Sequence, residues 1–246
     1  MNDTYKCYLI CLKDIEICKK QKNELKESLK KYSINSKVFD AIKGKEGYNI
    51  LNDFLERHNL KVKKFEKKLI EKHKEGRIGC LASHLILWEK CIKKNIDLLV
   101  LENDVIMLND IDYIIKNINK KDVIILDPFN PYSLSYDSQI SDEKKKEIKI
   151  LDGHIKRKIY NSKGAYCYYI TPNGAKKIIN FIKKSDTWMP ADYYLDDKIL
   201  KIGTVSKTIF RINPNYPSGI YSFTGNLKDC IKGKKANRRI ADIKDN

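Results

Sequence analysis

Two carboxylates and an amide follow one of the most apolar runs of the chain. Residues 96–101 are largely apolar, and Glu102, Asn103 and Asp104 come directly after them. Ligands of mostly parallel sheets bind beyond the carboxyl ends of the strands. Glu102 and Asp104, two apart on an extended segment, are expected to project to the same face. Such oxygen ligands bind Mg²⁺ or Mn²⁺, with phosphates completing the coordination shell. A solvated turn that leads to a helix near Asp110 explains the same residues equally well.

The elements that must position these residues are predicted from hydrophobic periodicity. Short apolar or alternating runs indicate strands, which are expected at residues 8–12, 36–41, 96–101, 122–127, 164–170 and 204–212. Helices are expected at residues 13–32, 77–94, 172–184 and 191–200. Because strands alternate with helices, the pattern favours an α/β fold with a mostly parallel or mixed sheet and helices on its faces. The charged stretch 48–75 is expected to be partly helical and exposed.

The helix at residues 77–94 is the clearest of these elements. Its apolar residues recur at spacings of three and four and form one stripe. His84 lies on this helix, and a lone histidine on an apolar helix is more often a structural hydrogen-bonding group than a ligand. Thr171 is the expected N-cap of the later helix, with Pro172 in its first turn.

The bulk composition limits the class of protein. The chain has 246 residues and a net charge of +17, and its length is that of one large α/β domain. An excess of positive charge attracts polyanions. The lysines are spread along helical segments, however, and a lysine-rich solvated surface explains the charge better. A nucleic-acid-binding protein is a lower-ranked alternative, and no nucleic acid partner is expected because no aromatic-basic signature or recognition-helix motif is present.

The sequence favours a cytoplasmic protein, with a peripheral contact to a membrane surface left open. The N-terminus lacks a signal-peptide pattern, and no apolar stretch approaches the ~20 residues of a membrane span. The seven cysteines contain no Cys-x-x-Cys pair, so reduced thiols are expected rather than a disulfide framework or a zinc site. No Gly-x-Gly-x-x-Gly follows the first strand, and neither a P-loop motif nor a Gly-x-Ser-x-Gly elbow occurs.

Several blocks of the sequence resemble glycosyltransferase family 25. The central block is Gly76-Arg77-Ile78-Gly79-Cys80-Leu81-Ala82-Ser83-His84-Leu85, then Trp88-Glu89-Lys90, then Leu98-Leu99-Val100-Leu101-Glu102-Asn103-Asp104-Val105. Supporting blocks are residues 9–12, 39–44, 164–171 and 174–177, so the resemblance covers roughly residues 8–200. The family includes bacterial lipooligosaccharide galactosyl- and glucosyltransferases and collagen hydroxylysine galactosyltransferases.

The resemblance implies a GT-A fold, here a single domain over residues 1–225 followed by a basic tail at residues 226–246. It also implies transfer of a hexose, galactose or glucose, from a UDP-sugar with inversion at the anomeric carbon. The expected acceptor is a glycan or a glycosylated or hydroxylated molecule, and the expected cofactor is a divalent ion, Mn²⁺ or Mg²⁺. Arg77 stands where the family usually has Glu, and Asn103 replaces its middle acid. A catalytically weak or inactive sugar-nucleotide-binding homologue is therefore the alternative.

The resemblance also implies roles for individual residues. Asp104, helped by Glu102 or Asn103, would hold the metal ion. Asp192, which matches the family's Asp after a Pro-containing loop, would be the catalytic base that takes the acceptor hydroxyl proton. An acid in the first turn of a helix explains Asp192 equally well, and Asp196 and Asp197 are alternative bases.

The nucleotide-sugar is expected to bind at strand ends and at the helix that carries His84. The residues assigned to it are Ile10, Leu12, Lys13, Asp40, Ala41, Ser83, His84, Glu102 and Asn103. Tyr166 and Tyr168 could stack on sugar, although buried core aromatics are the commoner case. Acceptor contacts are expected in the loops at residues 130–149 and 213–225.

Overall fold

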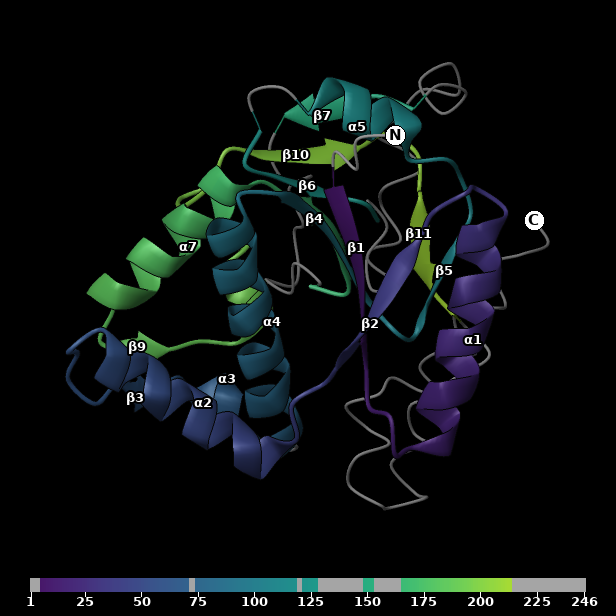
Figure 1. Ribbon diagram of the computed structural model, residues 1–246. Helices are drawn as coiled ribbons and strands as arrows, with labels where there is room; N and C mark the ends of the chain where they lie inside the picture. The colour runs from purple at the N-terminus through teal and green to yellow at the C-terminus, as the bar shows by residue number, and fades with distance from the viewer. Residues whose placement is uncertain (1–4, 71–73, 119–120, 128–147, 153–164, 214–246) are drawn as a thin grey trace.

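A seven-stranded mixed sheet forms the centre of the protein (Figure 1). The computed structural model describes residues 5–70, 74–118, 121–127, 148–152 and 165–213. Within these residues the strand order is β2-β1-β4-β8-β6-β10-β7. The strands are β1 (Tyr5–Cys11), β2 (Ser36–Asp40), β4 (Asp97–Glu102), β6 (Val123–Ile125), β7 (Ile150–Asp152), β8 (Cys167–Ile170) and β10 (Ile202–Val205).

The direction of the strands makes the sheet mixed. β1 runs parallel to both β2 and β4, and β6 runs parallel to β10. β8 lies between β4 and β6 and is antiparallel to both, and β7 is antiparallel to β10. The carboxyl ends of β2, β1 and β4 therefore meet at one edge, where the acidic segment, residues 102–104, begins. The predicted α/β fold with a mixed sheet is confirmed.

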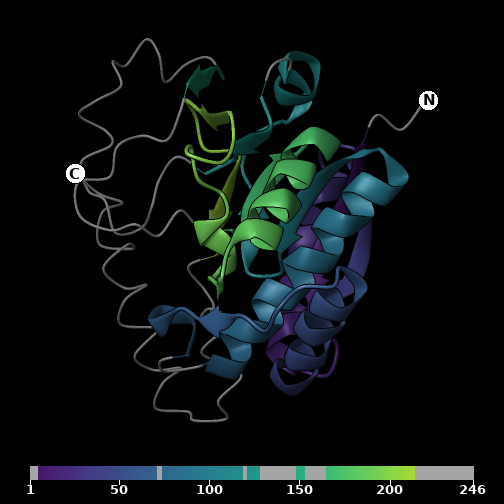
Figure 2. The ribbon, with the colours of Figure 1, turned by 90° about the vertical axis from the view of Figure 1, so that its left-hand side faces the viewer.

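Helices cover both faces of this sheet (Figures 1 and 2). One face carries α2 (Gly44–Arg57), α4 (Lys74–Lys94) and α7 (Pro172–Lys184), and Figure 2 shows α7 and α4 side by side on it. The other face carries α1 (Glu16–Lys30) and α5 (Asp112–Asn117). Alternate residues of β4 enter the two cores: Leu98 packs with the first set of helices and Leu99 with the second. This alternation follows from the two-residue period of a strand that is buried on both faces.

Two two-stranded sheets and a short helix lie outside the central sheet. β5 (Val105–Met107) follows the acidic segment and pairs antiparallel with β11 (Phe210–Ile212). β3 (Lys64–Phe65) pairs parallel with β9 (Thr187–Trp188), and α3 (Lys67–Ile70) follows β3. The β5–β11 pair fixes the chain directly after the acidic segment.

The local signals for helices α1, α4 and α7 were sufficient to predict them. α4 begins three residues earlier than expected, at Lys74. Thr171 caps α7 as predicted, because its Oγ1 accepts a hydrogen bond from the Gly174 amide at 3.1 Å while Pro172 occupies the first turn.

The expected helix at residues 191–200 is wrong. The structure has a short 3₁₀ helix, η1 (Ala191–Tyr193), followed by turns. Asp196 Oδ1 accepts a hydrogen bond from the Lys198 amide at 2.8 Å, which is the local side-chain bond that favours a turn over a helix.

The expected strand at residues 204–212 is two strands in different sheets. β10 ends at Val205 and joins the central sheet, whereas β11 begins at Phe210 and pairs with β5. Between them the amides of Ile209 and Phe210 both donate to the Leu126 carbonyl. The chain therefore crosses from one sheet to the other where the sequence shows one apolar run.

The stretch 48–75 is partly helical, as predicted, but it is exposed only in part. Its apolar residues Leu51, Phe54 and Leu69 are fully buried or nearly so. They belong to the core that α4 contributes to, because α2 packs directly on α4. Charged residues are interspersed along the sequence of α2, so its apolar face becomes evident only from the packing of α2 on α4.

Two further expectations concern the whole chain. The described cysteines Cys7, Cys11, Cys18, Cys80, Cys91 and Cys167 are all free thiols, as expected. None of the helices in the described ranges has both the length and the apolar character needed to cross a membrane. The basic tail at residues 226–246, the loop 130–147 and residues 214–225 lie outside the described residues.

Candidate active site

A pocket opens at the carboxyl edge of β2, β1 and β4. Its empty space amounts to about 530 Å³, including the part open to solvent. The strand register brings its walls together, because Ile10 of β1 pairs with Glu102 of β4 and Cys11 pairs with Asp40 of β2. The pocket is lined by Ile10, Leu12, Ala41, Ile42, Gly76, Cys80, Ser83, Glu102, Asn103 and Asp104.

The acidic segment is held from several directions. The Glu102 amide donates to the Tyr166 carbonyl at 2.7 Å, and the Asn103 amide donates to the Ile10 carbonyl at 3.1 Å. The Asp104 carbonyl accepts from the Asn213 amide at 2.6 Å. β4 ends at Glu102 and the chain turns at Asn103 and Asp104, so the predicted extended conformation of this segment is wrong. Both carboxylates line the same pocket because of this turn rather than because of strand alternation.

The side chain of Asn103 is anchored to the opposite helix. Its Nδ2 donates to Gln21 Oε1 of α1 at 2.5 Å, and both side chains are buried. Its amide nitrogen is thus engaged with α1, and its carbonyl oxygen is the atom left for a ligand. An amide at this position carries no charge, so the turn brings two carboxylates to the pocket and not three.

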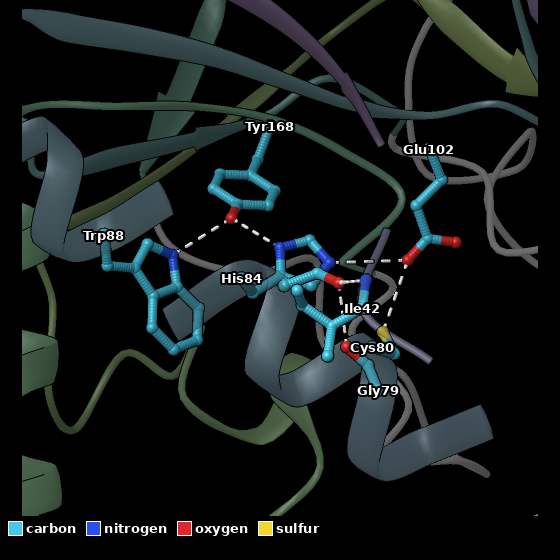
Figure 3. A network of polar contacts seen from close by, with 8 residues as sticks. Ile42, Gly79, Cys80, His84, Trp88, Glu102 and Tyr168 are labelled. Carbon is cyan, nitrogen blue, oxygen red and sulfur yellow. Dashed lines mark hydrogen bonds and ion pairs between the residues drawn. The ribbon is translucent and has the colours of Figure 1, made fainter. Parts of the chain in front are cut away.

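A buried chain of polar contacts leads from the core to Glu102 (Figure 3). Trp88 Nε1 donates to Tyr168 Oη at 3.0 Å, and Tyr168 Oη lies 2.8 Å from His84 Nδ1. His84 Nε2 lies 3.4 Å from Glu102 Oε1. Because the indole only donates and a carboxylate only accepts, a complete chain runs from Trp88 through the tyrosine hydroxyl to Nδ1 and from Nε2–H to Glu102.

These contacts give His84 and Tyr168 defined roles. His84 is fully buried and is not among the residues that line the pocket, but it contacts one that is. Tyr168 is fully buried in the core and does not have the exposed face needed to stack on a sugar. Tyr166 is half-buried, and its hydroxyl donates to Asp127 Oδ2 at 3.1 Å.

Cys80 lies where the negative charges of the site converge. Its Sγ donates to Glu102 Oε1 at 3.6 Å. Burial raises the pKa of this thiol well above its ordinary value, and the charges of Glu102, Asp192 and Asp104 raise it further. Cys80 is therefore a neutral thiol in the described state, and Asp192 lies close enough to act on it together with the acidic segment.

Asp192 comes to this centre from a distant part of the chain. It lies on η1, which packs on α4, and it is half-buried. It does not line the pocket itself. Of the alternative bases, Asp196 accepts a hydrogen bond from the Lys198 amide through Oδ1, and Asp197 is exposed.

The remaining predicted site residues fall into two groups. Ser83 lines the pocket, but its Oγ donates to the Gly79 carbonyl at 2.8 Å and accepts from the Ile42 amide at 2.9 Å. It thus fixes the loop after β2 that forms one wall. Lys13 and Asp40 do not line the pocket; they form an exposed ion pair with each other at 2.7 Å.

Ile42, Gly76 and Cys80 line the pocket and were not assigned from the sequence. Gly76 and Cys80 belong to the central block of the resemblance, so their position in that block was the available signal. Ile42 follows β2 directly, next to the assigned Ala41. It reaches the pocket because Gly79 lets α4 approach: a Cβ on Gly79 would lie 2.3 Å from the Ile42 carbonyl oxygen.

Comparison with known proteins shows similarity to glycosyltransferases. The profile of the family described as Glycosyltransferase family 25 (LPS biosynthesis protein) matches residues 5–195. A Haemophilus influenzae protein named "Putative glycosyltransferase" is 22% identical over 237 residues, which cover 91% of this chain and 77% of that protein. Another protein of the same organism, named "Lipooligosaccharide biosynthesis protein lex-1", is 27% identical over 153 residues, which cover 57% of this chain and 48% of that protein.

Proposed function

Because this chain belongs to glycosyltransferase family 25, we propose that it moves a hexose, galactose or glucose, from a UDP-sugar to an acceptor hydroxyl. The proposal includes inversion at the anomeric carbon and assistance by a divalent metal ion. It also assigns the mixed sheet and its flanking helices to the GT-A fold, in one domain over residues 1–225. The observation that carries the proposal is a pocket at a sheet edge that combines apolar walls with two carboxylates.

The pocket has the mixed apolar and acidic lining that a nucleotide-sugar requires. Ile10 and Leu12 from the end of β1 and Ala41 and Ile42 after β2 form an apolar side. We assign the nucleotide base to that side and the diphosphate to the acidic segment.

The acidic segment fits a hard divalent cation. Glu102 and Asp104 offer carboxylate oxygens, and Asn103 offers its carbonyl oxygen, which are the ligand types that Mg²⁺ and Mn²⁺ prefer. When bound, such an ion neutralises the charge that develops on the leaving UDP. Without a cation, two carboxylates beside a diphosphate repel it, so the lining itself requires a counter-charge for donor binding.

The chain supplies a base for the acceptor at the same centre. Asp192 would accept the proton of the acceptor hydroxyl while that oxygen attacks the anomeric carbon and the bond from that carbon to the UDP oxygen breaks. Attack opposite the leaving group inverts the anomeric configuration. The electrostatic effect of Asp192 on Cys80, together with Glu102 and Asp104, supports this placement.

The acceptor is proposed from the relatives. One matching protein is named for lipooligosaccharide biosynthesis, and the family description refers to LPS. We therefore propose a saccharide hydroxyl of a growing glycan as the acceptor. The site of action would be the cytoplasm, with a peripheral contact to the membrane surface where such glycans are assembled.

A UDP-release screen tests the proposal. Wild-type protein is incubated with a set of UDP-sugars and a mixture of glycan acceptors, with Mn²⁺, with Mg²⁺ and with chelator. We expect release with one UDP-hexose, its loss with chelator, and a decrease of about 10²–10³-fold in Asp104→Ala and Glu102→Gln. Asp53→Ala, on the exposed side of α2, is the matched control and should retain wild-type activity. Release that needs no metal and survives Asp104→Ala contradicts the proposal.

The uncharged Asn103 favours a second candidate, a protein that binds sugar-nucleotides with little or no turnover. Its amide faces Gln21 and brings no charge to the pocket. The same screen separates the two candidates when binding of UDP-sugar is measured by calorimetry alongside release. Binding without release in wild type, with release gained in Asn103→Asp, supports the second candidate.

A further inference from the structure

Three side chains with different ligand chemistry converge beside the pocket. Cys80 and His84 lie four residues apart on α4 and therefore on one face of the helix. Glu102 reaches them from the end of β4 (Figure 3). Their ligand atoms all lie within 4.8 Å of one another, with Sγ–Oε1 at 3.6 Å and Nε2–Oε1 at 3.4 Å.

We propose that Cys80, His84 and Glu102 form a binding site for a thiophilic divalent ion, with zinc as the best match. This site differs from the Mg²⁺ or Mn²⁺ site proposed on the acidic segment, although Glu102 is a ligand of both. Zinc bound here takes Glu102 away from the Mg²⁺ or Mn²⁺ site and thereby inhibits sugar transfer. The binding site stands on its own geometry; only the inhibition rests on the proposed function.

Two of the three separations between the ligand atoms are those of a tetrahedral zinc site. Zinc binds thiolate sulfur at about 2.3 Å, imidazole nitrogen at about 2.0–2.1 Å and carboxylate oxygen at about 2.0–2.2 Å. At tetrahedral angles these bond lengths put sulfur and oxygen about 3.5 Å apart and nitrogen and oxygen about 3.3 Å apart. The observed 3.6 and 3.4 Å match these two values. The third pair, sulfur and nitrogen, lies within 4.8 Å and must be about 3.6 Å apart on a tetrahedral ion, so closing that pair completes the site.

The ligand set favours zinc over the Mg²⁺ or Mn²⁺ proposed for the acidic segment. Thiolate and imidazole suit zinc, whereas Mg²⁺ requires oxygen ligands and Mn²⁺ prefers them. Cys80 and Glu102 both line the pocket, so an ion can enter from it. Three protein ligands leave the fourth tetrahedral position open toward the pocket, where water or a donor phosphate can occupy it.

The surroundings favour added positive charge. The carboxylates of Glu102, Asp192 and Asp104 act on Cys80, and a dication offsets their mutual repulsion. On binding, the Cys80 thiol releases its proton to solvent and becomes a thiolate ligand. His84 stays neutral: its proton moves to Nδ1, which donates to Tyr168 Oη, and Nε2 turns its lone pair to the metal.

Cobalt titration of the full chain tests the site without reference to activity. Co²⁺ replaces zinc in such sites and gives a near-ultraviolet thiolate-to-cobalt charge-transfer band, and zinc then displaces it. We expect the band in wild type, its loss in Cys80→Ser and an affinity for zinc lowered by at least about 100-fold in Cys80→Ser and in His84→Gln. Cys91→Ser, on the same helix but outside the triad, is the matched control and should keep the band.

The wild-type spectrum can overturn the proposal even if a variant does not fold. Absence of the band in wild type overturns it, and so does a band that persists in folded Cys80→Ser. The ratio of UDP release with and without zinc, measured in saturating Mn²⁺, tests the inhibition; a ratio of one in wild type that shows the band overturns that part. A cobalt band in a protein without transferase activity supports the site while the proposed function fails, so the two failures are distinguishable.

Discussion

At the scale of single residues, the pocket depends on partners that are far away in the sequence. Asn103 alone is a neutral substitute for an acid, but its amide is fixed by Gln21, 82 positions earlier. Glu102 is fixed by His84, 18 positions earlier. The side chains of Glu102 and Asn103 thus each have one atom held by the scaffold, which orients the other oxygen for a ligand.

The hydroxyl of Tyr168 is predicted to set the position of Glu102 through His84. Tyr168→Phe removes the acceptor of the Trp88 indole N–H and the partner of His84 Nδ1. We expect a loss of about 1–3 kcal/mol of unfolding free energy, because buried donors lose their acceptor. We also expect roughly a 10-fold lower kcat with Mn²⁺, because Glu102 is less well held.

Urea unfolding and steady-state UDP release measure the two effects. Tyr169→Phe is the matched control, since Tyr169 follows on the same strand, faces the opposite core and bonds to Asp97. It should lose stability while keeping kcat. Equal kcat values for the two variants would show that the chain from Trp88 to Glu102 has only a structural role.

At the scale of elements, the approach of α2 and α4 shapes the wall of the pocket. A Cβ on Gly79 would lie 2.3 Å from the Ile42 carbonyl oxygen and 3.3 Å from the Gly44 nitrogen. Both obstacles are backbone atoms, so nothing flexible can move aside. The lack of a side chain at Gly79 is therefore what lets the loop after β2 lie against α4 and carry Ala41 and Ile42 to the pocket.

Gly79→Ala is expected to destabilise the protein and to disturb donor binding together. The helix propensity of alanine favours the variant by about 1 kcal/mol, but overpacking against backbone costs about 1–3 kcal/mol or more. We expect a net loss of stability in thermal unfolding and a several-fold higher KM for the UDP-sugar. Gly47→Ala should lose less, because the nearest atom to its Cβ is the Ile78 Cγ2 methyl, at 2.9 Å. A stable Gly79→Ala variant with unchanged KM would show that this contact does not shape the pocket.

At the scale of the whole molecule, one sheet is buried between two cores, and polar groups at its ends affect global stability. Asp97, at the start of β4, accepts a hydrogen bond from Tyr169 Oη at 3.1 Å. Burial raises the pKa of Asp97 above its ordinary value, and the hydrogen bond from Tyr169 opposes that shift only partly. The folded protein therefore binds this proton more tightly than the unfolded chain does.

The sign of the pH effect follows from that linkage. A carboxyl with a raised folded pKa contributes stability that is complete below its unfolded pKa and is lost as pH rises through its folded pKa. Asp97→Asn removes this dependence while keeping an acceptor for Tyr169. We expect the variant to unfold at a midpoint about 1–3 °C higher at neutral pH, with the advantage shrinking as pH falls below the folded pKa. Thermal melts from pH 3 to 7 measure it, and parallel curves for the two proteins would contradict it.

The sequence alone determined the class of fold, the helices with strong local signals and the position of the acidic segment at the end of a strand. Those features are local: strand alternation, helical spacing, the Thr171-Pro172 cap and the ordered blocks of a family are all visible within a short window. Local patterns gave wrong predictions in two places. One is α2, whose apolar face is buried by a distant partner, and the other is the apolar run that forms β10 and β11 in two different sheets.

Only the tertiary structure decided which residues share the pocket. The register between β1, β2 and β4 brings Ile10, Asp40 and Glu102 to one edge, yet it leaves Lys13 and Asp40 paired outside the lining. The packing of α4 beside the end of β4 also brings Cys80 and His84 into contact with Glu102. The physical reason is that a strand end fixes where a segment arrives, whereas the direction of each side chain is set by long-range hydrogen bonds and by the close approach of helices, which no local pattern encodes.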